Sequence, residues 1–97
     1  MRFGLKEKTI DNIHQVLIRY PQVEQAIIFG SRAKGNFKTG SDIDLALKGQ
    51  LSLTTINKLS NEIDDLLLPY TFDLISLSGI NNSELLDHIK RVGVVFY

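Results

Sequence analysis

Apolar residues recur at helical spacing in two long stretches of the chain. The first covers about residues 6–19 and ends at Pro21, because proline cannot continue a helix. The second covers about residues 53–68 and is closed by Pro69. Its apolar stripe is formed by Leu53, Ile56, Leu59, Ile63, Leu66 and Leu67. Both stretches predict amphipathic helices.

A third helical stretch begins at Asn81. Glu84 follows three residues later, which is the spacing of a capping box, and Gly93 is suited to end the helix. The residues expected to pack inward are Leu85, Leu86, Ile89 and Val92. The closing sequence "VVFY" predicts either a short final strand or a docked tail.

Short runs rich in β-forming residues lie between these helices, at residues 24–30, 41–47 and 70–77. The second run alternates: Ile43, Leu45 and Leu47 would face one way, and Asp42, Asp44 and Ala46 the other. The order of elements predicts an α/β (α+β) protein, in which helices pack on one small mixed sheet. We find no linker or internal repeat and expect a single domain over residues 1–97.

Composition narrows the classes of function. Of the 97 residues, 43% are hydrophobic, the formal net charge is zero and cysteine is absent. Balanced charge disfavours broad binding to nucleic acid or to an anionic membrane. The lack of cysteine excludes disulfides and thiolate metal sites. No apolar run has the length of a signal peptide or a membrane span, so we expect a cytoplasmic protein.

Three aspartates occur within predicted strands, where carboxylates are out of place. Asp42 and Asp44 are two residues apart, so they would project from one face with Cα atoms roughly 6–7 Å apart. Such a pair is sensible if a divalent cation lies between the carboxylates, and Mg²⁺ prefers oxygen ligands. Asp73 would join them if its strand pairs beside theirs. The alternative is that these aspartates face solvent or occupy a turn.

The loop before the aspartates predicts a phosphate site. Gly30 and Ser31 follow a strand and open a segment, "SRAKG", that can form one helical turn with exposed backbone N–H groups. Arg32, Lys34 and Lys38 would add mobile positive charge. The stretch matches neither the Walker motif nor the dinucleotide fingerprint. Taken alone, these are also ordinary loop residues; their position directly before the two aspartates favours a phosphate site.

Taken together, these residues resemble a known family. Gly30-Ser31, ten further residues and then Asp42-x-Asp44 match the G-S-x10-D-x-D signature of the nucleotidyltransferase superfamily, which includes DNA polymerase β and kanamycin nucleotidyltransferase. Asp73 falls where the family places its third carboxylate. The small size is similar to that of the minimal nucleotidyltransferases, which consist of the catalytic core only, and the resemblance covers nearly the whole chain.

The resemblance implies a function for each of these residues. Gly30 and Ser31 would bind the phosphates of a nucleoside triphosphate, with Arg32 as a further contact. Asp42 and Asp44 would hold two Mg²⁺ ions, and Asp73 would complete one metal site or act as a general base. The reaction would be nucleotidyl transfer, with AMP taken from ATP and pyrophosphate released.

The resemblance also implies a partner. Minimal members often accompany a helical HEPN-type protein, and some of these pairs are toxin–antitoxin systems in which the transferase modifies the toxin. The expected partners are therefore a nucleoside triphosphate and a HEPN-type protein, in a homo- or hetero-oligomer. The chain lacks the second, substrate-binding domain of larger members, which leaves the acceptor open.

Two other classes of function compete with this interpretation. The chain could be a non-catalytic binding subunit, or an antitoxin that acts by contact with a helical partner. An RNA-binding or nuclease domain is disfavoured, because charge is balanced and no base-stacking motif appears. His14 and His88 lie on predicted helices without another ligand at a convincing spacing, and we expect structural or surface roles for both.

Overall fold

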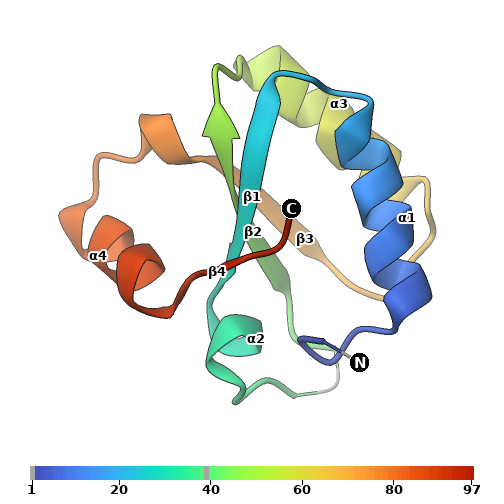
Figure 1. Cartoon of the computed structure of the whole chain (residues 1–97), viewed down its shortest axis with the longest axis horizontal. Helices are drawn as coiled ribbons and strands as arrows, with labels where there is room; N and C mark the ends of the chain where they lie inside the picture. The colour runs from blue at the N-terminus through green and yellow to red at the C-terminus, as the bar shows by residue number, and fades with distance from the viewer. Residues whose placement is uncertain (1, 39) are drawn as a thin grey trace.

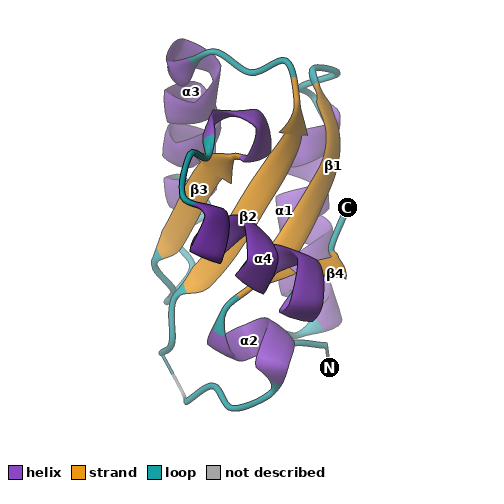
Figure 2. Cartoon of the chain, turned by 90° about the vertical axis from the view of Figure 1, so that its left-hand side faces the viewer, coloured by secondary structure: helices purple, strands orange, loops and turns teal. Residues whose placement is uncertain are grey.

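The computed structural model describes residues 2–38 and 40–97, which form one four-stranded sheet with helices on both faces (Figures 1 and 2). The elements in chain order are α1 (Glu7–Ile18), β1 (Val23–Phe29), α2 (Ser31–Lys34), β2 (Ile43–Gly49), α3 (Leu53–Asp64), β3 (Phe72–Ser76), the 3₁₀ turn η1 (Leu77–Gly79), α4 (Ser83–Val92) and β4 (Val94–Val95). The strand order is β3-β2-β1-β4.

The sheet is mixed, as predicted. β2 and β3 are parallel, with α3 as the crossover between them, whereas β1 is antiparallel to both β2 and β4. Helices α1 and α3 cover one face and α4 covers the other, while α2 lies beyond the end of β1 (Figure 2). The α/β (α+β) class and the helices packed on the sheet are therefore confirmed.

The alternation along β2 sends its side chains into two separate apolar clusters. Ile43, Leu45 and Leu47 are fully buried in the larger cluster, under α1 and α3. Ala46 faces the other way and packs with Phe29 and with Ile89 of α4. A polar side chain on that second face, next to Ala46 in the alternation, consequently lies on the face that α4 covers.

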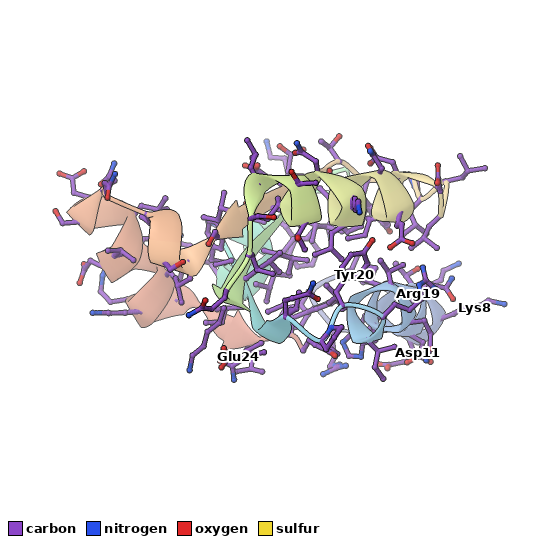
Figure 3. All side chains as sticks on the ribbon, turned by 90° about the horizontal axis from the view of Figure 1, so that it is seen from above. Lys8, Asp11, Arg19, Tyr20 and Glu24 are labelled. Atoms are coloured by element: carbon purple, nitrogen blue, oxygen red, sulfur yellow. The ribbon has the colours of Figure 1, made fainter. Side chains whose placement is uncertain are left out.

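Polar contacts join α1 and α3 at one end of the layer that they form. Arg19, just after α1, lies 3.5 Å from Glu62 of α3, measured between Nη2 and Oε1. A side-chain hydrogen bond to the same Glu62 raises the pKa of Tyr20, and both Arg19 and Tyr20 lie where the two helices meet (Figure 3). None of the three aspartates takes part in these contacts, which link the two helices of this layer.

The end of α3 differs from the prediction. The helix stops at Asp64 instead of continuing to residue 68. Leu67 adopts φ 55°, a left-handed conformation that cannot continue a right-handed helix. Leu67 was expected in the apolar stripe, yet 88% of it is exposed. Leu53, at the start of the predicted stripe, is also largely exposed, whereas Leu66 packs against the core.

The start of α4 is also displaced by one residue. The N-cap is Asn82, whose Oδ1 accepts hydrogen bonds from the backbone N–H groups of Glu84 at 2.9 Å and Leu85 at 3.2 Å. The capping box expected between Asn81 and Glu84 is therefore wrong, although an asparagine does begin the helix. Gly93 ends α4 as expected.

The closing residues form both of the structures that the sequence left open. Val94 and Val95 pair with β1 as a two-residue strand, and Phe96 is buried against the core. The backbone of residues 96 and 97 continues to bond Ala26 of β1. In the described ranges, every helix is too short or too polar to cross a membrane.

Candidate active site

The parallel pairing of β2 and β3 places two of the predicted site residues side by side. Asp44 and Asp73 are direct partners in the register, so their Cα atoms are separated by about one strand spacing, ~4.8 Å. Both project from the face that carries Ala46 and Ile75, which is the face covered by α4. The expectation that the third strand lies beside the second, with Asp73 next to the first pair, is thus met by the geometry.

Asp42 differs slightly from its expected position. It lies one residue before β2 rather than within the strand, and its side chain is exposed. Its charge nevertheless reaches Asp44, because Coulombic repulsion from Asp42 helps to raise the pKa of Asp44. The three carboxylates therefore gather at the entrance of β2 and β3.

Asp44 is the most constrained of the three. Burial raises the pKa of its carboxyl group above the ordinary value, and the negative charges of Asp73 and Asp42 raise it further. His88 of α4 acts in the opposite direction and lowers it. A cation bound among the three carboxylates would offset the repulsion between their negative charges.

Gly30 brings the preceding loop directly against Asp44. Gly30 has φ 74° and ψ −155°, a conformation that is essentially restricted to glycine. A Cβ atom added there would collide with the Asp44 carboxylate oxygen Oδ2. Glycine is therefore required for two reasons, backbone conformation and close approach.

Ser31 begins the one-turn helix that the sequence predicted. The carbonyls of Gly30 and Ser31 accept hydrogen bonds from the N–H groups of Lys34 and Gly35, at 3.1 and 2.9 Å. Gly30 supplies no capping side chain, so the first N–H groups of α2 have no partner within the helix. The turn begins beside Asp44, which places N–H donors next to the carboxylates.

Arg32 is not one of the mobile cations that the loop was expected to offer. Only 3% of the residue is exposed, and its guanidinium donates to the backbone carbonyls of Phe3 and Ser41. Lys34 and Lys38 are exposed and fit the expectation. The contact between Arg32 and a phosphate stays a prediction.

His88 is a residue of this site that sequence reasoning set aside. Its ring meets Phe29 edge to face, with centroids 6.1 Å apart, and Phe29 is the partner of Asp44 in the register of β1 and β2. Its position above the sheet depends on how α4 packs. No local spacing in the sequence contains that information.

The three carboxylates suit Mg²⁺ in chemistry but do not form a finished cage. Within the ranges 2–38 and 40–97, no three His, Asp or Glu side chains are already arranged to hold a metal ion together. Hard carboxylate oxygens on one face are nevertheless the ligands that Mg²⁺ prefers, and it commonly takes only one or two from the protein. The donor set therefore fits an ion that also binds substrate phosphates and water.

A separate hollow of about 580 Å³ lies at the other end of β3, between the start of α3 and the start of α4. Its lining includes Leu53, Ser76 and Asn82 and none of the three aspartates. The carboxylates and the hollow are therefore distinct features of the surface.

Comparisons with known proteins agree with this geometry. The family model described as "Polymerase beta, Nucleotidyltransferase" matches residues 11–97. No curated protein sequence matches the chain.

Solved structures share the fold at low sequence identity. A toxin–antitoxin complex with AMP-PNP has a TM-score of 0.75 and 22% identity, over 91% of this chain and 72% of that chain. A complex of tri-AMPylated Shewanella oneidensis HEPN toxin with MNT antitoxin has a TM-score of 0.71 and 19% identity, over 96% of this chain and 72% of that chain. A structure provisionally assigned to the minimal nucleotidyltransferases has a TM-score of 0.73 and 21% identity, over 97% of this chain and 95% of that chain.

Proposed function

The chain belongs to the polymerase beta nucleotidyltransferase family, and from that membership we propose that it transfers AMP from ATP to an acceptor hydroxyl in a Mg²⁺-dependent reaction. A bond forms between the acceptor oxygen and the α-phosphorus. The bond from the α-phosphorus to the oxygen that bridges to the β-phosphate breaks, pyrophosphate leaves, and the hydroxyl proton passes to a base.

The observation that carries this proposal is the register of β2 and β3. It sets Asp44 opposite Asp73, while Gly30 presses the start of the phosphate loop against Asp44. A triphosphate held by the loop would therefore have its reacting end beside the carboxylates. Such positioning, together with electrostatic stabilisation, accounts for most of the rate enhancement in phosphoryl-type transfer.

Each residue has a defined part in the proposed reaction. Backbone N–H groups at Gly30 and Ser31 hold the phosphates that leave as pyrophosphate. Asp42, Asp44 and Asp73 would hold Mg²⁺, which neutralises the triphosphate and aligns the attacking and leaving oxygens when bound. Asp73 is exposed at the edge strand, where it can accept the proton of an incoming hydroxyl.

We propose a HEPN-type helical protein as the acceptor. The support is that solved structures with this fold are antitoxins in complexes with HEPN toxins, one of which is tri-AMPylated.

Labelled ATP tests the reaction directly. The chain is incubated with Mg²⁺, the proposed HEPN-type acceptor, and ATP labelled on either the α- or the γ-phosphate. We expect only the α-label to enter the acceptor. The double variant Asp42→Asn/Asp44→Asn should reduce the rate at least about a hundredfold, whereas Asp11→Asn, an exposed aspartate of α1, should leave it unchanged. Equal transfer by the wild type and the double variant contradicts the proposal.

A further inference from the structure

We propose that Arg32 is a positioning residue that fixes the backbone of Asp42 against the Gly30–Ser31 turn, and that it does not bind phosphate. The inference rests on the proposed function for the roles of Asp42 and of the turn. Its basis is the set of contacts that the guanidinium makes within the protein.

The guanidinium of Arg32 forms hydrogen bonds with the peptide unit between Ser41 and Asp42. Its Nε and Nη2 both donate to the carbonyl oxygen of Ser41, at 3.1 and 2.9 Å. That carbonyl belongs to the planar peptide unit that joins Ser41 to Asp42, so fixing its oxygen also fixes the nitrogen and Cα of Asp42. Two donors that converge on one oxygen restrict the orientation of the guanidinium as well as its distance from the carbonyl.

Asp42 is held from its other side too. The N–H of Ile43 donates to the carbonyl of Thr71 at 2.9 Å, just before β3. The turn that delivers Ser41 is itself closed, because the Lys38 N–H donates to Ser41 Oγ at 2.8 Å. The backbone on each side of Asp42 is thus fixed by hydrogen bonds, through the Ser41 carbonyl and the Ile43 N–H, and Arg32 is the donor to the first of these.

Two aromatic rings hold the guanidinium in place. Its central carbon lies 5.0 Å from the centroid of the Phe37 ring and 4.9 Å from that of Tyr70, distances typical of cation–π contact. Tyr70 lies on the segment that enters β3, which carries Asp73. Arg32 itself follows Ser31. The Arg32 side chain therefore contacts the residue before Asp42 and the segment before the strand of Asp73, and its backbone follows the Gly30–Ser31 turn.

The N-terminal segment completes the enclosure. Nη1 donates to the carbonyl of Phe3 at 2.8 Å, and the turn at residues 2–5 is closed by hydrogen bonds between Arg2 and Leu5. A Cβ atom added at Gly4 would overlap the Phe37 ring and approach Arg32 Nη1 to 3.0 Å. With 3% of the residue exposed, a phosphate reaches this guanidinium only by displacing the protein around it.

The conservative variant Arg32→Lys separates positioning from phosphate binding. Lysine keeps the charge but has a single ammonium group, which cannot reproduce the pair of hydrogen bonds from Nε and Nη2 to the Ser41 carbonyl. The probe for the carboxylates is Mn²⁺, with the free ion followed by electron paramagnetic resonance. We expect the affinity for Mn²⁺ to fall about tenfold. Exchange of the Ser41 and Ile43 amides should quicken, while that of Ala46 in β2 is unchanged. In the transfer assay kcat should fall more than KM for ATP rises.

Controls separate this effect from loss of charge or loss of fold. Lys58→Met removes an exposed charge on α3 and should leave every readout as in the wild type. Phe37→Leu removes one of the two rings without touching a donor, and should cause a smaller change in the same direction. It serves as the test if Arg32→Lys does not fold.

Three results would overturn the inference. One is unaltered Mn²⁺ affinity and amide exchange in a folded variant. Another is weaker binding of ATP in the presence of EDTA with Mn²⁺ affinity unchanged, which is the behaviour of a phosphate ligand. The third is a wild-type protein that does not bind Mn²⁺. If the wild type binds Mn²⁺ in an Arg32-dependent way but transfers no nucleotide, the inference stands and the proposed function fails.

Discussion

Among single residues, Asp44 is held in place by both neighbouring strands and is also one of the three carboxylates of the candidate site. Its backbone is paired on both sides, to Phe29 of β1 and Asp73 of β3, so the side chain cannot move far from its neighbours. Burial and two adjacent carboxylates raise its pKa. Ionisation of Asp44 is therefore less favourable in the native fold than in the unfolded chain.

This constraint predicts how stability depends on pH. A carboxyl whose pKa is raised in the folded state binds its proton more tightly there than in the unfolded chain, so its contribution to stability is lost as pH rises from the ordinary aspartate value through the raised one. Asp44→Asn should consequently raise Tm at neutral pH in EDTA, and the gain should disappear by about pH 3. Calorimetry measures both, with Asp11→Asn as the control. A lower Tm for Asp44→Asn at neutral pH contradicts the account.

Gly30 provides a second prediction at this scale, with Gly35 as its matched control. Both have positive φ, 74° and 88°, but a Cβ at Gly30 meets the Asp44 carboxylate, whereas a Cβ at Gly35 has no heavy atom within 4 Å. Gly35→Ala should lose only about 1–2 kcal/mol of unfolding free energy, the cost of a left-handed alanine. Gly30→Ala should lose more and should also abolish transfer. Urea unfolding of both variants measures the difference, and equal losses would contradict the requirement for glycine at residue 30.

The residues of the site differ in how far sequence could predict them. Asp42, Asp44 and Asp73 stand out because a carboxylate in an apolar run needs an explanation, and Gly30 because glycine often marks close approach of the backbone. Arg32 and His88 carry no such local signal. Burial of Arg32 depends on Phe3 and Tyr70, which are distant in sequence, and the place of His88 depends on the packing of α4.

Among the elements, α4 is stabilised both by packing against the sheet and by capping of its first turn. It covers the face of the sheet that holds the carboxylates, yet Ile89 is the only one of its side chains that is buried. Hydrogen bonds from its first turn to Asn82 therefore matter for its stability. The sequence predicted the helix because apolar spacing is local, and missed its first residue because Asn81 and Asn82 are both good caps.

The two asparagines allow a test of that assignment. Asn82→Ala should reduce the free energy of unfolding by about 1 kcal/mol, because two N–H groups of α4 lose their acceptor. Asn81→Ala should change it little, since α4 is capped without it. Thermal unfolding of the two variants distinguishes them, and a larger effect at Asn81 would restore the start expected from sequence.

At the scale of the whole molecule, residues 2–38 and 40–97 bring the Gly30–Ser31 turn, two strand aspartates and Asp42, just before β2, together within a radius of gyration of 12.6 Å. That value is close to the ~12.5 Å expected of a compact chain of this length. In the proposed reaction, a partner protein supplies the acceptor. An antitoxin that acts by contact alone would not need the carboxylates, whereas a transferase would.

The most direct test is the intact mass of the proposed HEPN-type partner after co-expression with the wild-type chain or with Asp42→Asn/Asp44→Asn. The account predicts one or more adenylyl groups on the partner with the wild type and none with the double variant. Asp11→Asn, the matched control, should modify the partner as the wild type does. An unmodified partner that the wild type and the double variant neutralise equally well would contradict the account and leave binding by contact as the function.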